Sequence, residues 1–274
     1  MLGFAALVAG WQLWVSARHV EAFVVPTPGR IAKAAIDDRA TFWAASVATL
    51  VRAAEGFVLG AIAGVLLAIV IHRVRLARQV LYPLLVIVQT IPPIVLAPLF
   101  VIWFGYGDEP KVLLVVLIVL FPVLVATVEG LDGADGELVD LARSMGATPR
   151  RVLRVVRLPS ATPSAFAGLR IAATYAIGGA VVAEYLGGSD EPKGLGFSIQ
   201  AWKRSYEIDH IFVAVVLVGV LTALLFVAVD GAARRAVPWQ HPDRSTRTWL
   251  LRRRATAERR AAALTSSSPP TEAR

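Results

Sequence analysis

The chain has 274 residues, of which 56% are hydrophobic and only 18% are charged, and its net charge is +8 at neutral pH. Its mean hydropathy of +0.63 is well above that of a soluble domain, so the composition excludes a soluble globular protein and indicates a membrane protein. Cysteine is absent, which also excludes disulfides, thiolate metal ligands and a cysteine nucleophile.

The apolar stretches are long enough to cross a membrane several times. A hydrocarbon core about 30 Å thick requires roughly 20 apolar residues in a helix. We therefore expect an all-α polytopic membrane protein with about six transmembrane helices, at residues 2–17, 49–71, 81–105, 112–128, 165–187 and 211–229. The first stretch lacks the basic start and the cleavage site of a signal peptide, and is expected to remain as an anchor.

The composition divides the chain into three parts. Residues 1–44 are expected to form the first transmembrane helix and an external connector, because VVPTPGRI contains a turn followed by a short helical pattern. Residues 45–233 should form the membrane core, with a charged loop at about 131–164. Residues 234–274 form a basic tail that ends in LTSSSPPTEAR, a composition typical of disorder.

The second span, 49–71, carries Gly56, Gly60 and Gly64 at every fourth residue. Such a stripe lets two helices approach closely, and we favour packing over a ligand role. Near the start of this span, Arg52 and Glu55 are three residues apart on one helix and are expected to pair with each other.

The third span contains Pro92, Pro93 and Pro98. Each proline removes a backbone donor and should kink or open the helix. Because freed carbonyls need partners in lipid, this span should pack against other helices or line a cavity. Polar groups inside spans are costly and mark candidate pathway residues, although each can also serve as a helix-to-helix hydrogen bond. The candidates are Gln89, Thr90, Thr174, Tyr175 and Glu184, with Glu129 near a span end.

The segment ELVDLARSMGATPRRVLRVVRLP, residues 137–159, interrupts the apolar chain with five arginines. Apolar residues at helical spacing predict a short helix that Gly146 ends or bends: Leu138, Leu141, Ala142 and Met145. Thr148 and Pro149 then suit a cap and a first helical position, and Pro159 is expected to stop the second helix. On periodicity alone, an amphipathic hairpin on the membrane surface explains the segment equally well.

The basic residues indicate the orientation. With six spans and an inside start, the inside segments hold 19 of the 28 lysines and arginines and the outside segments hold 9. Although the long tail supplies part of this excess, the short loops favour the same side. Both termini and the charged loop should therefore face the cytoplasm, and nucleic acid binding is not expected.

The placement of glycine and proline in the charged loop resembles the EAA loop of ABC importer permeases. In that loop a glycine follows an acidic residue by six positions, and an aliphatic-x-Leu-Pro sequence ends thirteen positions after the glycine. Here Leu141 replaces the usual alanine, and the matching positions are Asp140, Ala142, Gly146, Ala147, Val156, Leu158 and Pro159. The stretches IPPIVLAPLFVIWFGYG, FPVLVATVEGL and PSATPSAFAGLRIA resemble permeases of the nitrate, sulfonate and taurine importers.

This resemblance implies the type I ABC importer permease fold and a multi-pass protein of a prokaryotic inner (plasma) membrane. It implies as partners a second permease copy, two ATP-binding subunits that hold ATP and Mg²⁺, and an external solute-binding protein. The chain has no phosphate-binding loop of its own and no metal-spaced histidine cluster. We therefore expect no catalytic residue, cofactor or metal here, and no enzyme. The residues expected to couple to the ATP-binding subunit are Glu137, Asp140, Leu141, Ala142, Met145, Gly146, Ala147, Leu158 and Pro159.

Other functions remain open at this stage. A self-sufficient carrier or channel is the second hypothesis and a membrane enzyme a distant third, but the sequence shows no internal repeat of the kind that secondary transporters carry. A small anionic solute such as a sulfonate, taurine or nitrate is the leading prediction for the cargo. Closely similar permeases serve thiamine or pyrimidine precursors, which we keep as the alternative.

Overall fold

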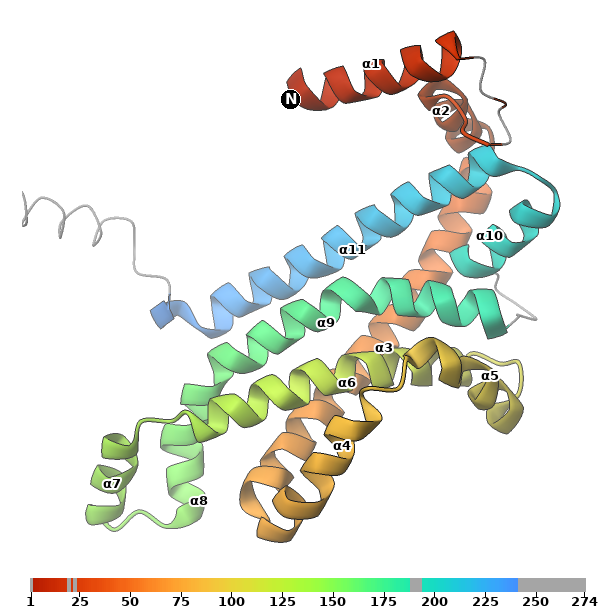
Figure 1. Cartoon of the computed structure of the whole chain (residues 1–274). Coiled ribbons are helices and arrows are strands. Elements are labelled where there is room, and N and C mark those ends of the chain that lie inside the picture. The colour runs from red at the N-terminus through yellow and green to blue at the C-terminus, as the bar shows by residue number, and fades with distance from the viewer. Residues whose placement is uncertain (1, 19–20, 22–23, 188–193, 241–274) are drawn as a thin grey trace, which may run out of the picture. The chain divides into compact units, whose positions relative to one another are not determined.

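The computed structural model describes residues 2–18, 21, 24–187 and 194–240, and every regular element within them is a helix (Figure 1). The chain divides into two compact units, Met1–Ala233 and Arg234–Arg274. The packing described below belongs to the first unit. The predicted tail lies outside the described residues from position 241 onward.

Eleven α-helices are present in this part of the chain. In order they are α1 (Leu2–Ala17), α2 (Pro28–Asp37), α3 (Arg39–Arg73), α4 (Tyr82–Val88), α5 (Pro93–Phe104), α6 (Glu109–Asp132), α7 (Gly136–Ser144), α8 (Pro149–Val152), α9 (Leu158–Gly187), α10 (Leu195–Arg204) and α11 (Ile208–Ala236). Two π-helical turns, η1 (Ala77–Leu81) and η2 (Leu153–Arg157), lie before α4 and α9, and a 3₁₀ turn, η3 (Pro238–Gln240), follows α11.

Among the described residues, four helices are long and apolar enough to cross a membrane. They are α3, α6, α11 and the continuous helix Pro149–Gly187 that α8, η2 and α9 form together. Each contains one of the predicted spans. Helices α3, α6 and α11 extend beyond both predicted ends, and the helix Pro149–Gly187 extends beyond the predicted start only. The predicted first span is helix α1, which at 16 residues is shorter than the usual crossing length of roughly 20 residues.

The predicted third span is broken rather than continuous. The helical stretches Ala77–Val88 and Pro93–Phe104 meet at an angle of 99°, which confirms the predicted break at Pro92 and Pro93. Pro98 lies inside α5 and does not end it. Pro92 has ψ of 124° and caps α5, because a residue that precedes a proline is pushed away from helical geometry. Two half-length helices therefore replace one straight span (Figure 1).

The core of the first unit lies where α6 packs along both α3 and α9. A Cβ added at Gly56 would lie 2.5 Å from Cβ of Val115, and one added at Gly60 would lie 2.7 Å from the carbonyl oxygen of Val116. The same close approach to α6 recurs at Gly64. The glycine stripe of α3 therefore serves helix packing, as predicted.

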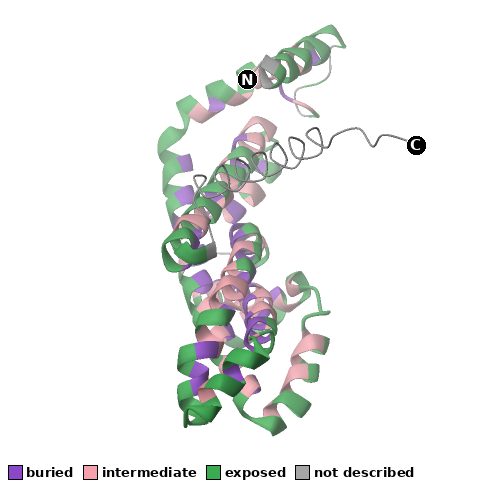
Figure 2. Cartoon of the chain, turned by 90° about the vertical axis from the view of Figure 1, so that its left-hand side faces the viewer, coloured by how far each residue is buried: buried purple, intermediate pink, exposed green. Residues whose placement is uncertain are grey.

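Many large apolar side chains of the long helices remain exposed. Figure 2 shows exposed residues, in green, along the lengths of the helices as well as at their ends. Leu66 on α3 is 58% exposed, Val216 on α11 is 59% exposed and Ile102 on α5 is 76% exposed. Apolar surface on this scale marks contact with a membrane or with other chains.

Candidate functional site

The first half of the charged loop is a short helix with defined ends. The side chain of Asp135 caps α7 by accepting a hydrogen bond of 2.9 Å from the backbone N–H of Glu137. At the other end Gly146 has φ of +80°, its N–H donates to the carbonyl of Arg143, and the N–H of Ala147 donates to the carbonyl of Ala142. These two bonds form a Schellman motif, which fixes where the helix stops.

The second half of the loop does not end at Pro159, and this prediction was wrong. The helix that begins at Pro149 runs without interruption to Gly187. The reason is the π-helical turn η2, in which the N–H of Leu158 donates to the carbonyl of Leu153, five residues back. The wider turn accommodates the ring and the missing donor of the proline that follows.

A second π-helical turn precedes a proline elsewhere among the described residues. In η1 the N–H of Tyr82 donates to the carbonyl of Ala77, and Pro83 follows directly. Both π-helical turns thus precede an X-Pro pair by the same offset. In the loop, the hydroxyl of Ser160 also donates to the carbonyl of Val156 at 2.8 Å, which supplies one more donor near the proline.

The two halves of the loop form a hairpin with its own small core. Val139, Val152 and Val156 are buried together, with Ala142 and Ala147 partly buried against them. This packing holds α7 against the start of the continuous helix Pro149–Gly187, as Figure 1 shows at one end of the bundle. The loop is therefore a rigid extension of a membrane-crossing helix.

The predicted apolar face of α7 points mostly away from this hairpin core. Leu138 is 50% exposed, Leu141 is 57% exposed and Met145 is 80% exposed. A hollow of about 280 Å³ lies beside them, lined by Ala142, Met145, Gly146, Ala147, Arg151 and Val155. The rest of this chain therefore leaves the side chains of Leu138, Leu141 and Met145 largely uncovered.

The remaining coupling candidates lie at two places in the loop. Glu137 is in the first turn of α7, and Asp140 is exposed and pairs with Arg143 at 3.4 Å. Leu158 and Pro159 lie at the start of α9, where Leu158 packs against the apolar cluster at the ends of α3 and α6. All nine predicted coupling residues therefore lie on or directly beside the hairpin.

Three of the predicted pathway residues line one cavity. Gln89, at the break between α4 and α5, and Tyr175 on α9 both face a cavity of about 770 Å³. Glu129 on α6 lines it as well, together with Phe121 and other mostly apolar groups. The hydroxyls of Thr90 and Thr174 instead donate to carbonyls of their own helical turns, each at 2.7 Å.

Glu184 lies elsewhere, in a buried ionic cluster between α3, α9 and α10. Its carboxylate accepts hydrogen bonds from the hydroxyl of Thr49 at 2.9 Å, from Arg52 at 3.0 Å and from the backbone N–H of Gly196 at 2.9 Å. The N–H of Leu195 in turn donates to Thr49. The cluster ties the start of α10 to both long helices.

Arg52 does not pair with Glu55 as predicted. Its guanidinium is buried and contacts Glu184 and Asp108, the latter at 2.8 Å, whereas Glu55 is exposed. The reason is burial. A guanidinium buried between helices cannot be solvated by water, so it pairs with carboxylates that the fold places next to it. Lys111, also buried, contacts the same Asp108 from three residues away, at 3.4 Å. The two partners of Arg52 lie far along the chain, and nothing local in the sequence signals them.

Comparison with known proteins identifies the class of molecule that carries this loop. Residues 56–241 match the sequence profile of the family described as binding-protein-dependent transport system inner membrane component. The chain belongs to this family. This permease is thus a multi-pass inner-membrane component of a transport system, and the matched region contains the whole charged loop.

Two relatives and one solved structure illustrate the similarity. The permease is 34% identical over 241 residues to the formylaminopyrimidine transport permease protein of Halalkalibacterium halodurans, over 87% of this chain and 94% of that one. It is 29% identical over 200 residues to the taurine transport system permease protein of Escherichia coli, over 73% and 72% of the two chains. It shares its fold with the methionine ABC transporter in an inward-facing conformation, with a TM-score of 0.53 and 24% identity over 71% of this chain and 94% of that chain.

Proposed function

We propose that this permease is driven by a separate ATP-binding subunit that docks on the exposed face of α7. We define this docking face as Leu138, Leu141 and Met145. The observation that carries the proposal is that a capped, rigid helix presents uncovered apolar side chains outside the span region. Burying such a face against a partner is favourable by about 25 cal/mol per Å² of apolar surface.

The hairpin also supplies a way to transmit motion. Because α7 packs on the helix Pro149–Gly187, a displacement of the docking face moves a membrane-crossing helix directly. Packed helices switch between discrete arrangements rather than deforming continuously. A second copy of the permease, two ATP-binding subunits and an external solute-binding protein complete the importer that we propose, with both termini and the loop in the cytoplasm.

The docking face can be tested by placing a charge on it. We expect Leu141→Glu to reduce the amount of ATP-binding subunit that copurifies with tagged permease from native membranes by about tenfold, because a carboxylate would be buried without a partner. Leu76→Glu is the matched control, since Leu76 is 68% exposed and lies outside the loop. Equal copurification with the two variants contradicts the docking face, and copurification of no ATP-binding subunit with the unaltered chain contradicts the whole proposal.

For the solute, the cavity favours a neutral or cationic aromatic ring over an anion. The lining among the described residues includes the carboxylate of Glu129 and the rings of Tyr175 and Phe121, but no arginine or lysine. A carboxylate repels nitrate or a sulfonate, whereas aromatic rings stack on a flat heterocycle. We therefore propose a pyrimidine precursor ahead of the sulfonate, taurine or nitrate that the sequence favours.

Uptake by the reconstituted importer distinguishes these solutes. We expect a hydroxymethylpyrimidine-type compound to compete for transport at concentrations at which taurine and nitrate do not. If only taurine or nitrate competes, the order is reversed and an anionic solute becomes the preferred cargo. Both outcomes leave the role of the loop unchanged.

A further inference from the structure

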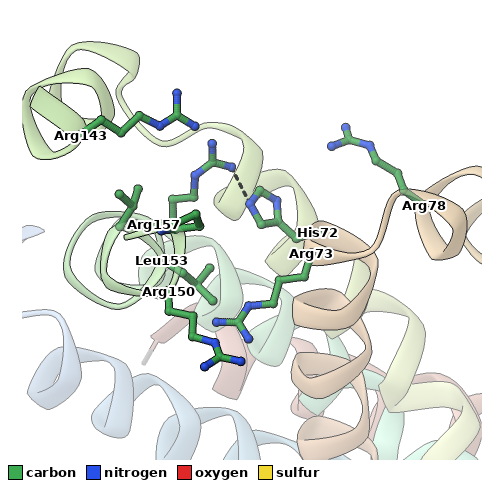
Figure 3. A pocket seen from close by; sticks show the side chains of 9 residues that line it. His72, Arg73, Arg78, Arg143, Arg150, Leu153 and Arg157 are labelled. Carbon is green, nitrogen blue, oxygen red and sulfur yellow. Dashed lines mark hydrogen bonds between the residues drawn. The ribbon is translucent and has the colours of Figure 1, made fainter. Parts of the chain in front are cut away.

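A second, strongly basic recess lies where the loop meets the ends of the long helices. Its volume is about 490 Å³, and we call it the basic pocket. It is lined by His72, Arg73, Arg78, Arg143, Pro149, Arg150, Val152, Leu153 and Arg157. Figure 3 shows that these side chains come from three directions: the end of α3, the region of Arg78 after it, and the loop hairpin.

Part of the positive charge is balanced within the chain. Asp132, the last residue of α6, accepts hydrogen bonds from Arg78 at 2.7 and 3.2 Å and from Nδ1 of His72 at 2.9 Å. Arg157 donates to Nε2 of His72. Because a guanidinium only donates, Nε2 accepts and Nδ1 carries the proton given to Asp132. One carboxylate thus orders three basic groups on one wall.

The rest of the charge in the pocket has less compensation. Within the described part of the chain, the only carboxylate that Arg143 contacts is the exposed Asp140, at 3.4 Å. Arg73 and Arg150 have no carboxylate within 4.0 Å among the residues that the structure describes. In Figure 3 both extend to the lower side of the view, away from the Arg157–His72 contact. Guanidinium groups that share a recess repel one another, and an anion between them would relieve that repulsion.

The residue types and the level of the pocket indicate the kind of anion. Guanidinium forks match the tetrahedral oxygens of phosphate and bind them through paired hydrogen bonds. The pocket lies where α3 ends at Arg73 and α6 ends at Asp132, the level at which lipid headgroups meet the spans. Val152 and Leu153 give part of its wall an apolar character, and basic pockets between membrane helices on the inner side suit anionic headgroups.

We propose that the basic pocket binds a phosphate group, with Arg73 and Arg150 as its direct ligands, while Arg157, held by His72 and Asp132, adds positive charge from another wall of the pocket. The phosphate can belong to an anionic lipid headgroup or to a soluble phosphate. Bound there, it joins the end of α3 to the start of the loop hairpin. If the phosphate belongs to a lipid, the proposal requires the loop to face the cytoplasm, as the proposed function has it. It depends on no other part of the proposed function.

The experiment compares two double variants of the purified full-length permease in detergent. Arg73→Gln/Arg150→Gln removes two pocket charges. Arg75→Gln/Arg154→Gln removes two exposed charges from the same segments, outside the pocket lining. For each protein we measure the concentration of phosphatidylglycerol, and separately of inorganic phosphate, that gives half-maximal thermal stabilisation, with phosphatidylcholine as the baseline.

We expect the pocket variant to need at least about tenfold more anion, and the control variant less than about twofold more, because each lost guanidinium removes a charge-assisted hydrogen bond. Loss of the phosphatidylglycerol response alone identifies a headgroup, and loss of the inorganic phosphate response alone identifies a soluble phosphate. No response in the unaltered chain, or equal loss in both variants, overturns the proposal. In a parallel copurification from native membranes, loss of the ATP-binding subunit from the pocket variant, with its lipid response unchanged, would also overturn the proposal and assign the pocket to an acidic protein segment. The measurement needs neither ATP nor solute, so its failure leaves the transport proposal standing.

Discussion

Gly146 is the residue on which the shape of the loop depends most directly. Its φ of +80° lies in the left-handed region, which costs a residue with a side chain roughly 1–2 kcal/mol. A Cβ added there would meet no atom within 4 Å, so the cost of substitution comes from the backbone and not from crowding. The Schellman bonds of Gly146 and Ala147 both depend on this conformation.

We expect Gly146→Val to lower solute uptake per ATP hydrolysed by roughly five- to thirtyfold, in line with a backbone cost of about 1–2 kcal/mol. The measurement is uptake and ATP hydrolysis by the complex in proteoliposomes. Gly146→Asn is the control, because asparagine tolerates the left-handed region better than valine does. Equal, unaltered ratios for both variants would show that the loop does not need this turn.

Substitution of Glu184 tests the buried ionic cluster, which lies at the end of α9 far from the loop. We expect Glu184→Gln to destabilise the permease by about 1–3 kcal/mol, because the buried guanidinium of Arg52 would lose its buried carboxylate partner and keep the partly exposed Asp108. Thermal unfolding in detergent, followed by tryptophan fluorescence, measures the change. Glu55→Gln makes the same substitution at an exposed position of α3, and we expect it to stay within about 0.5 kcal/mol. A similar shift for both would remove the special role of the cluster.

These two residues show what the sequence can and cannot predict. The turn at Gly146 is a local matter of backbone geometry, and the spacing of the loop predicts it. The partners of Arg52 lie 56 and 132 residues away, so only the fold brings them together, and local spacing misleadingly favours Glu55. Gln89 and Tyr175 meet at one cavity for the same reason, which no pattern in either span predicts.

Among the helices, the contact between α3 and α6 is the one most sensitive to side-chain size. We expect Gly60→Ala to destabilise the permease by about 1–3 kcal/mol, because the new methyl group would overlap the carbonyl of Val116 and Cβ of Val119. Gly219→Ala on α11 is the control, since a Cβ there meets nothing within 4 Å. Thermal unfolding in detergent compares them, and a loss at Gly219 as large as at Gly60 would contradict the packing argument.

The helices themselves are largely predictable because membrane-spanning segments are read from apolar length and from proline. The break at Pro92 and Pro93 follows from their missing donors and restricted backbone. Pro159 shows the limit of that rule, because it lies inside a continuous helix, as do Pro98, Pro122 and Pro163. A proline alone therefore does not fix where a helix ends. The π-helical turn η2 accommodates Pro159. Leu153 and Leu158 pack against the ends of α3 and α6, and the sequence alone does not show this contact.

Across the whole permease, η2 sets the angle at which the loop leaves the membrane-crossing part of its helix. We expect Pro159→Ala to restore an ordinary i→i−4 bond, to remove the extra residue of the π-helical turn and to rotate the hairpin by about 100°, the turn per residue of an α-helix. ATP hydrolysis should persist while uptake per ATP falls several-fold. Pro163→Ala is the control within the same helix, and the same fall for both variants would show that the π-helical turn is not responsible.

The continuous helix Pro149–Gly187 has a further consequence for communication between the two sides of the membrane. At 39 residues it is about 58 Å long, nearly twice the thickness of the hydrocarbon core. One end carries the loop hairpin, and the other, through Glu184, holds α10. A tilt about its middle would move its two ends in opposite directions at once. In the importer that we propose, this one helix would therefore link solute delivery on one side of the membrane to the ATP-binding subunit on the other side.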